Sequence, residues 1–359
     1  MKKKLVMAVG GTGGHIYPAI ALADQLKLEN PHLDILFIGG KLEQNRYFEQ
    51  GKYPYKSTHC GSLSRNPVKL IQAGFNILKG AWDSRKILRE FKPDLMVGFG
   101  SYHSFPALAA ASQSNVPFIL HESNSIPGKV NRLLSSYADV TGILFPSAAS
   151  KLKGKTELVH MPLRAGYRKG SASEEEALRY FNLTSGKPTL LIFGGSQGAQ
   201  ALNQLAAEGL EGDFQVIHIA GNKVHLEIIK QAYIKKGIQA CVKEFESRMD
   251  LAWQAANIAL CRAGAGTIAE AIEFEVPCLL VPYPHAADDH QRGNADFFCE
   301  TIKGGISHSE KDLTPFILNQ RIHILYDQLY SELKSSLKKY KQNQSRKSFS
   351  HLIAEHLQL

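Results

Sequence analysis

Two glycine-rich turns contain residues that could hold a phosphate. Residues 10–14 (Gly-Gly-Thr-Gly-Gly) and 194–198 (Gly-Gly-Ser-Gln-Gly) each follow a short apolar run. Glycine lets the backbone turn sharply after a strand, and the helix that follows offers free N–H groups and its positive dipole end to an anion. Neither turn has the GxGxxG spacing and distal acid of a dinucleotide site. Each alone could be an ordinary strand-to-helix turn, but two in matching places favour one shared cleft.

A third glycine-containing loop, residues 261–266, leads into a helix that carries Glu270. Small residues would let a ligand lie against this loop. A carboxylate one turn into the helix could accept hydrogen bonds from both hydroxyls of a ribose. The alternative is that Glu270 only interacts with the helix dipole, a contact worth roughly 0.3–1 kcal/mol.

Further polar residues follow apolar runs, where the carboxyl edge of an open α/β sheet binds ligands. They occupy residues 121–124 (His-Glu-Ser-Asn), the glycine-containing segment 98–106 and the cluster 288–295. The first of these sets could instead only cap the next helix. Asp288 and Asp289 have no second pair of ligands, so we expect no metal site.

Short apolar runs alternate with helical patterns along the chain, and they must position these residues. Near-continuous apolar strands separated by helices predict parallel sheets covered on both faces. The length of 359 residues and the echo between the two glycine turns predict two Rossmann-like domains, with a boundary near residues 162–170. The predicted strands are residues 5–9, 35–38, 95–99, 117–121, 140–144, 158–160, 190–193, 216–220, 241–245, 258–261 and 278–282.

Composition narrows the class of protein. Hydrophobic residues make up 44% and charged residues 21%, which is typical of a globular chain, and the net charge of +9 favours an anionic partner. The five scattered cysteines form no zinc spacing and indicate a reducing compartment. The apolar run after the first lysines is too short for a signal peptide, and no other run is long enough to span a bilayer. We therefore expect a soluble or peripheral protein.

Taken in order from residue 4 to about 305, these segments resemble the MurG family, whose members add N-acetylglucosamine (GlcNAc) to the lipid-linked MurNAc-pentapeptide of peptidoglycan synthesis. The residues that carry the resemblance are 10–18, 121–124, 194–199, 262–267 with Glu270, and His290, Gln291, Asn294 and Ala295.

The resemblance implies an α/β fold of the GT-B type, with two Rossmann-like domains whose parallel sheets face an interdomain cleft. Residues 1–163 would form an acceptor- and membrane-associating domain, to which a C-terminal helix at about 341–359 returns. Residues 164–340 would bind UDP-GlcNAc. No cofactor and no metal are implied. The partners would be UDP-GlcNAc, lipid-linked MurNAc-pentapeptide and an anionic membrane surface, with no nucleic acid.

The resemblance also implies roles for single residues. Ser196 and Gln197 would bind the diphosphate of the donor, and Glu270 its ribose. The backbone near Glu246 would read the uracil. The sugar would be held by Gln291, Asn124 and the Ala265 backbone, and Arg164 would help to neutralise the leaving diphosphate. The acceptor would be received by two loops of the first domain that include Thr12, Gly13, Gly14, Gly100, Ser101 and Tyr102.

An inverting single displacement is the predicted mechanism: the MurNAc 4-hydroxyl attacks the anomeric carbon while UDP departs. His15 is the candidate base, because a helix N-terminus disfavours the charged imidazole and leaves the ring able to accept a proton. His15 could instead only bind substrate or lock its loop. Glu122 is the reserve candidate.

The sequence departs from the family pattern in places. Met161 stands where the family commonly has Asn, although Arg164 is kept. Ser101, His103 and Phe105 stand where Gly, an aliphatic residue and Gly are common. These departures affect the expected contacts with the acceptor.

Residues 68–89 read as a helix with Ile71, Phe75, Leu78 and Trp82 on one face. Seven Lys or Arg against two acids between residues 65 and 92 give it a basic rim. This pattern fits an interfacial helix over anionic lipid, at the cytoplasmic face of the inner membrane. The alternative is a core-facing helix with a solvated basic side.

Other functions remain open on the sequence. A UDP-GlcNAc epimerase of similar fold would need no acceptor, and a sensor would bind the donor without turnover. A dehydrogenase lacks its ribose-binding acid, and no nucleic-acid module is recognisable. Another lipid glycosyltransferase that uses a UDP-sugar would differ only in sugar and acceptor.

Overall fold

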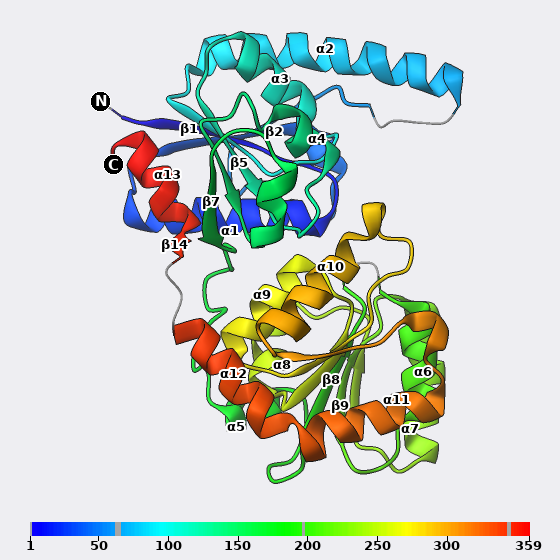
Figure 1. The fold of residues 1–359 in the computed structure, drawn as a ribbon. Coiled ribbons are helices and arrows are strands. Elements are labelled where there is room, and N and C mark those ends of the chain that lie inside the picture. The colour runs from blue at the N-terminus through cyan, green and yellow to red at the C-terminus, as the bar shows by residue number, and fades with distance from the viewer. Residues whose placement is uncertain (1, 62–65, 196–197, 343–345) are drawn as a thin grey trace. The chain divides into compact units, whose positions relative to one another are not determined.

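The computed structural model describes residues 2–61, 66–195, 198–342 and 346–359. The chain divides into two compact units (Figure 1). The N-terminal unit comprises Met1–Ala165 and Arg346–Leu359, and the C-terminal unit comprises Gly166–Ser345. Arg164 therefore lies in the N-terminal unit.

The N-terminal unit is built on an eight-stranded sheet of order β14-β7-β6-β5-β4-β1-β2-β3, in which every pairing is parallel. Its strands are β1 (Lys4–Ala8), β2 (Asp34–Gly40), β3 (Tyr55–Thr58), β4 (Leu95–Gly98), β5 (Phe118–Glu122), β6 (Val140–Ile143), β7 (Thr156–His160) and β14 (Lys347–Ser348). Its helices are α1 (Gly13–Glu29), η1 (Leu42–Gln44), α2 (Pro67–Phe91), α3 (Phe105–Gln113), α4 (Lys129–Leu134), η2 (Pro146–Lys151) and α13 (Phe349–Leu357).

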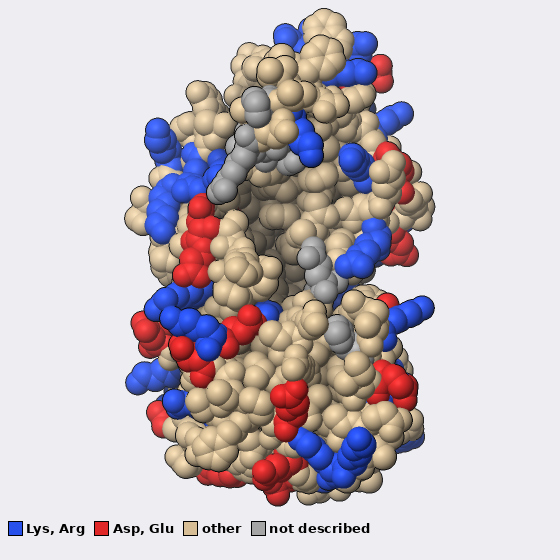
Figure 2. Space-filling view, turned by 90° about the vertical axis from the view of Figure 1, so that its right-hand side faces the viewer, with Lys and Arg blue, Asp and Glu red and all other residues tan. Residues whose placement is uncertain are grey.

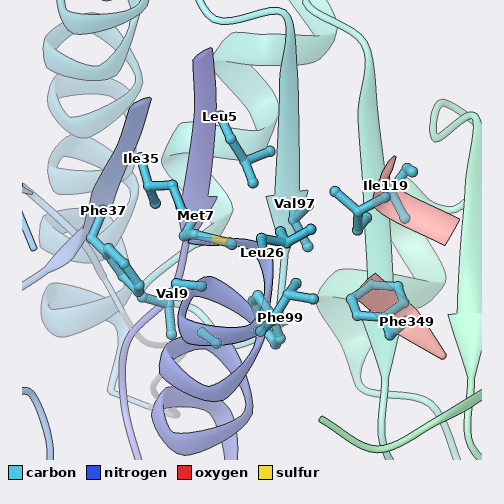
Figure 3. Close-up of a cluster of buried hydrophobic side chains, with 14 of the residues drawn as sticks. Leu5, Met7, Val9, Leu26, Ile35, Phe37, Val97, Phe99, Ile119 and Phe349 are labelled. Carbon is cyan, nitrogen blue, oxygen red and sulfur yellow. The ribbon is translucent and has the colours of Figure 1, made fainter. Parts of the chain in front are cut away.

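Alternation along the strands builds a core on each face of this sheet. Leu5, Met7 and Val9 point to the face covered by α1 and α13, where they meet Leu26 and Phe349 (Figure 3). The intervening residues point to the opposite face and pack with residues of α2, α3 and α4. Because both faces are covered, the central strands such as β1 and β4 are almost entirely apolar, as is typical of a parallel sheet.

The C-terminal unit contains a six-stranded sheet of order β10-β9-β8-β11-β12-β13, again parallel at every pairing. Its strands are β8 (Thr189–Phe193), β9 (Gln215–Ile219), β10 (Ala240–Lys243), β11 (Ile258–Cys261), β12 (Cys278–Leu280) and β13 (Gly305–Ser307). Its helices are α5 (Glu174–Tyr180), α6 (Gln200–Gly209), α7 (Lys223–Lys235), α8 (Met249–Ala255), α9 (Ala265–Phe274), η3 (Ala287–Asp289), α10 (His290–Asp296), η4 (Phe297–Thr301), η5 (Glu310–Asp312), α11 (Pro315–His323), η6 (Ile324–Gln328) and α12 (Tyr330–Gln342).

All eleven strands expected from the apolar runs are confirmed, within a few residues at their ends. The structure adds β3, β13 and β14, which are short and lie at or near sheet edges. The chain re-enters the first sheet at its end, where β14 pairs with β7 and α13 buries Phe349, Leu352 and Ile353 against the strands. In each unit the loops that leave the carboxyl ends of the strands share one edge of the sheet.

Candidate active site

The glycine turn of the N-terminal unit joins β1 to α1 and is held from two sides. Gly11 has φ +88°, a conformation that favours glycine. The Asn45 side chain donates to the Gly11 carbonyl at 2.7 Å, and the Ser101 hydroxyl donates to the Gly10 carbonyl at 3.1 Å. Any Cβ at Gly10 would lie 2.5 Å from the Cβ of His103, so the loops after β1 and β4 are in close contact.

Helix α1 begins directly after this turn. Thr12 makes no side-chain cap, and it is exposed together with Gly14, whereas Gly13 is buried. The first N–H groups of a helix lack partners within the helix, and the dipole is positive there. The expected acceptor residues Thr12, Gly13 and Gly14 thus lie at a helix N-terminus, a position suited to an anion.

His15 lies in the first turn of α1 and is half-buried. Its Nδ1 atom lies 2.8 Å from the carbonyl oxygen of Phe99, at the end of β4. A carbonyl can only accept, so Nδ1 carries the proton and Nε2 holds the lone pair of the neutral ring. Burial lowers the pKa of the nearby His121 to about 3, and the charge of His15 contributes a smaller effect in the same direction.

Glu122 ends β5 and is buried, with 3% of its surface exposed. Its Oε1 accepts from the Asn124 N–H at 2.9 Å, and its Oε2 accepts from the Gly128 N–H and the Asn131 amide, both at 2.9 Å. Burial raises the pKa of this carboxyl although the hydrogen bonds lower it. The carboxylate therefore fixes the loop that presents Asn124, whose side chain remains half-buried beside it.

The second loop expected to receive the acceptor follows β4 and contains Gly100, Ser101 and Tyr102. Gly100 has φ +75° and Ser101 has φ +82°, so Ser101 adopts a conformation that favours glycine. The Ser104 hydroxyl donates to the carbonyl of Ser101 at 3.0 Å. Gly100 is buried and Tyr102 is half-buried. The loop is tied to the first glycine turn through Ser101, which joins the two parts of the expected acceptor site.

Arg164 lies over the ring of Tyr17 on α1, with its Cζ 5.1 Å from the ring centroid. Tyr17 in turn meets Tyr47 edge-on at 5.8 Å. Burial raises the pKa of Tyr17, whereas the Arg164 charge lowers it. The structure thus places the charge of Arg164 close to the first turns of α1.

The glycine turn of the C-terminal unit joins β8 to α6. Ser196 and Gln197 lie outside the described residues. On either side of them, Gly195 has φ +87° and Gly198 has φ +74°. A Cβ at Gly198 would lie 2.7 Å from the Ala220 carbonyl, so Gly198 packs closely against the end of β9.

Helix α9 carries the expected ribose and sugar contacts. Ala265 is its first residue and is buried, and Gly264 precedes it without a side-chain cap. Glu270 lies one turn further on, and the buried indole of Trp253 donates to its Oε2 at 2.7 Å. Trp253 therefore orients the carboxylate that we expect at the ribose.

Gln291 lies in the first turn of α10, and its Oε1 accepts from the Tyr283 N–H at 2.9 Å. Three residues later, the buried Asn294 donates from its side chain to the Ala263 carbonyl at 3.1 Å. This bond ties α10 to the loop before α9, so the structure connects the Gln291 helix with the Ala265 loop.

Glu246 follows β10 and is 5% exposed. Its carboxylate accepts from the Lys243 ammonium at 2.6 Å, the Arg248 N–H at 2.7 Å and the Tyr180 hydroxyl at 3.1 Å. Burial raises the pKa of Glu246, but these donors, led by Lys243, hold it below its ordinary value. The side chain thus fixes the loop, and the neighbouring backbone is left as the part that could read a base.

Helix α2 turns its expected apolar stripe outward. The side chains of Ile71, Phe75, Leu78 and Trp82 are 76%, 67%, 72% and 62% exposed. The helix is buried on the other side, through small residues such as Ala73 and Ser84. Helix α2 lies at the top of Figure 1, and the top of the space-filling view shows tan side chains with blue Lys and Arg beside them (Figure 2). The core-facing alternative is therefore wrong.

Several residues that hold the site together were not anticipated from the sequence. They are Asn45 at the first glycine turn, Asn131 at Glu122 and Trp253 at Glu270. None belongs to a local spacing pattern that indicates its partner. Across the described residues, no three His, Cys, Asp or Glu side chains are grouped to hold a metal ion. No helix in the described ranges is both long enough and apolar enough to cross a membrane.

Comparison with known proteins places this arrangement in a family. Residues 5–143 match the glycosyltransferase family 28 N-terminal domain, and residues 189–356 match the corresponding C-terminal domain. A relative from Protochlamydia amoebophila is 45% identical over 99% of this chain and 96% of its own length. It bears the name UDP-N-acetylglucosamine–N-acetylmuramyl-(pentapeptide) pyrophosphoryl-undecaprenol N-acetylglucosamine transferase. The chain belongs to the MurG family of glycosyltransferases.

Other MurG relatives and solved structures agree. A transferase of the same name from Chlamydia pneumoniae is 35% identical over 99% of both chains. The crystal structure of Acinetobacter baumannii MurG matches with a TM-score of 0.78 and 27% identity over 99% of both chains. A UDP-glucose: anthocyanidin 3-O-glucosyltransferase, at 15% identity and a TM-score of 0.71 over 100% of this chain and 99% of its own, shares the fold. The expected GT-B class of two Rossmann-like domains with parallel sheets is thus confirmed.

Proposed function

We propose that this chain catalyses the MurG reaction and that its N-terminal unit binds the acceptor and its C-terminal unit the donor. GlcNAc passes from UDP-GlcNAc to the MurNAc 4-hydroxyl of undecaprenyl-pyrophosphoryl-MurNAc-pentapeptide. The observation that carries the residue-level assignment is local. In each unit, the residues matched to the family motifs gather at the carboxyl edge of a parallel sheet, around the start of α1 and of α9.

The acceptor assignment places the carrier pyrophosphate at residues 12–14, where α1 begins, and the MurNAc near Gly100, Ser101 and Tyr102. His15 then stands beside the reacting hydroxyl. Its Nδ1–H is directed to the Phe99 carbonyl, so the proposal assigns the proton of the 4-hydroxyl to Nε2. Glu122 is the weaker candidate for this role, because its carboxylate already accepts from two N–H groups of its own loop and from the Asn131 side chain of α4.

The donor assignment uses the residues of the C-terminal unit. The turn that contains Ser196 and Gln197 binds the diphosphate, Glu270 the ribose, and the backbone next to Glu246 the uracil. Gln291 and the Ala265 N–H bind the sugar, together with Asn124 of the N-terminal unit. Trp253 holds the Glu270 carboxylate in place through its indole N–H.

The chemical step is one displacement. The 4-hydroxyl oxygen of MurNAc forms a bond to the anomeric carbon of GlcNAc, and its proton goes to His15. The bond from that carbon to the diphosphate oxygen breaks, and UDP leaves with the electron pair, which inverts the anomeric centre. Helix N-termini and the Arg164 guanidinium stabilise the negative charge that develops on the diphosphate.

We further propose that the chain binds the cytoplasmic face of the inner membrane through α2. The exposed stripe of Ile71, Phe75, Leu78 and Trp82 would enter the headgroup boundary. The flanking Lys and Arg would face anionic lipid, where each is worth about 1 kcal/mol near the surface. This position would bring the enzyme to its lipid-linked acceptor.

The test is transfer by the purified full chain from UDP-GlcNAc with a radiolabelled sugar to lipid-linked MurNAc-pentapeptide. We expect label in the lipid fraction only when the acceptor is present, and the same rate with and without EDTA. Release of an epimerised sugar without acceptor would indicate an epimerase. Binding of UDP-GlcNAc without any turnover would indicate a sensor, and label on a different lipid would indicate another lipid glycosyltransferase.

A further inference from the structure

We propose that the ion pair between Arg262 and Glu310 is a positioning element that orients Gln291 and thereby sets the selectivity for the donor sugar. The inference rests on the proposed function, because it takes Gln291 to contact the sugar of the donor. Neither member of the pair was assigned a role in the site above. The argument starts from the burial of Arg262.

Arg262 follows β11 and is only 7% exposed. Its Nη1 donates to the Val281 carbonyl at 3.2 Å and more weakly to the Pro282 carbonyl at 3.4 Å. Its Nη2 donates to Oε2 of Glu310, in η5, and its Cζ lies 5.5 Å from the centroid of the Tyr283 ring. One buried cation therefore contacts three consecutive residues of the loop that follows β12.

The same loop fixes the side chain of Gln291. Oε1 of Gln291 accepts from the Tyr283 N–H at 2.9 Å. A backbone N–H can only donate, so the oxygen of the amide faces Tyr283 and the NH₂ group points the other way. Gln291 is thereby set to donate to an oxygen of its ligand, which suits a sugar hydroxyl.

The backbone that carries Gln291 is fixed separately. Asn294 is fully buried on the same helix and holds the Ala263 carbonyl, next in sequence to Arg262. The backbone position of Gln291 thus depends on Asn294, and its amide orientation depends on Tyr283. The ion pair contacts the loop of Tyr283 directly, whereas the Asn294 side chain bonds to the Ala263 carbonyl and to neither side chain of the pair.

The geometry requires an arginine. A guanidinium can donate to the two carbonyls and to Glu310 at once, whereas the compact ammonium of lysine cannot match this planar spread of donors. Removal of the Glu310 charge would leave a buried cation without its counter-charge, which is strongly unfavourable. Either change should therefore release residues 281–283 and the Gln291 amide with them.

The first experiment reads the positioning step without any substrate. Hydrogen exchange of the Tyr283 amide is measured by NMR in the full-length wild type and in R262K, E310Q and Q291A. We expect at least tenfold faster exchange in all three variants. The control is E273Q. It weakens the ion pair between Glu273 of α9 and Lys341 of α12, and it should leave the exchange rate of the Tyr283 amide unchanged. Unchanged exchange in E310Q or R262K, at a Tm close to wild type, would overturn the proposal. If R262K does not fold, E310Q carries the same test, since Glu310 is partly exposed.

The second experiment reads the consequence for the sugar. The ratio of kcat/KM for UDP-GlcNAc over its epimer UDP-GalNAc is measured for the same variants. We expect R262K and E310Q to lower this ratio about tenfold through KM of the donor, with the KM of the acceptor unchanged. In the Q291A background, R262K should cause no further loss, because both changes remove one contact. Additive losses would overturn the proposal. If the wild type transfers no GlcNAc, the proposed function fails, and the exchange data still decide whether the pair positions Gln291.

Discussion

The Nδ1 atom of His15 lies 2.8 Å from the carbonyl oxygen of Phe99, so a backbone acceptor fixes which nitrogen of this ring carries the proton. The base role predicts that H15A lowers kcat by about 10²–10⁴-fold, the usual contribution of a positioned base. The KM for UDP-GlcNAc should change little, since the donor is assigned to the other unit. Steady-state transfer kinetics measure both quantities.

The matched control for this variant is H32A, because His32 is an exposed histidine in a turn of the same unit. It should keep wild-type kcat. Near-wild-type kcat in H15A would refute the base role and leave His15 as a residue that only binds substrate or locks its loop.

The indole N–H of Trp253 donates to the Glu270 carboxylate at 2.7 Å. If this carboxylate binds the ribose, nucleotide affinity should depend on the ribose hydroxyls. The wild type should bind UDP more tightly than 2′-deoxy-UDP, and E270A should lose most of this difference, about tenfold in Kd for a buried hydrogen bond. W253F should show a smaller loss, because the carboxylate is present but no longer oriented. Isothermal titration calorimetry with the two nucleotides measures the difference.

A change on the same helix serves as the comparison. Glu273 on α9 forms an ion pair with Lys341 at 3.0 Å, and E273A should retain the preference for UDP. Equal discrimination in E270A and wild type would mean that Glu270 has only the helix-dipole role.

The sequence was sufficient for the strands that are buried on both faces and insufficient for those at the edges. Buried parallel strands consist almost entirely of apolar residues, so runs such as residues 190–193 predict them directly. By contrast, β3 reads Tyr-Lys-Ser-Thr and β14 consists of Lys347 and Ser348. Such edge strands need no continuous apolar run, and only pairing with a distant segment reveals them.

The candidate site divides in a similar way. Glycine turns and the polar residues after strands are local features, and residues such as His15 and Glu270 were found from them. Trp253 and Arg262 act through partners that are distant in the sequence, and neither residue type signals such a partner. The sequence also identified the stripe on α2 but left open which way it faced, because an amphipathic pattern fits a core or a membrane equally well.

The exposed stripe on α2 predicts binding to anionic vesicles. The double change F75S/W82S should reduce the bound fraction at least tenfold on vesicles that contain phosphatidylglycerol, because it removes both aromatic side chains of the exposed stripe. Binding should also weaken as salt rises, since the basic rim is screened. Vesicle sedimentation measures the bound fraction.

Leu28 offers a matched control in the same unit, because it is 85% exposed on α1 and lies outside the stripe. L28S should bind vesicles as the wild type does. Binding that ignored both the stripe variants and the anionic lipid content would exclude α2 as the membrane surface.

The burial of His218 leads us to expect that acid destabilises the C-terminal unit. Its ring is buried between the Tyr233 hydroxyl at 2.8 Å and the Asn203 side chain at 3.0 Å. Asn203 donates its amide to the Ala220 carbonyl, so its oxygen accepts from Nε2–H of His218, and the neutral ring accepts from Tyr233 at Nδ1. Burial lowers the pKa of His218 to about 3 in the folded protein.

The sign of the effect follows from that pKa. The unfolded chain has an ordinary histidine pKa of about 6.5 and binds more protons than the folded chain below it. Stability is therefore complete above pH 6.5 and is lost as the pH falls toward 3, by about 1 kcal/mol between pH 7 and 5.5 from this residue. In the N-terminal unit, the buried His121 acts in the same direction, but the raised pKa of Glu122 acts in the opposite one. The C-terminal unit is thus the cleaner test.

The chain has two tryptophans, and Trp253 is the one in the C-terminal unit, so a W82F background leaves its fluorescence as a reporter of this unit alone. Urea unfolding of this parent should show a lower midpoint at pH 5.5 than at pH 7. H218Q should be less stable than the parent at pH 7, but it should lose less stability between pH 7 and pH 5.5. H308Q changes a partly exposed histidine of the same unit and should keep the wild-type loss. If H218Q lost as much stability as the wild type over this range, the neutral buried ring would not be the source of the acid sensitivity.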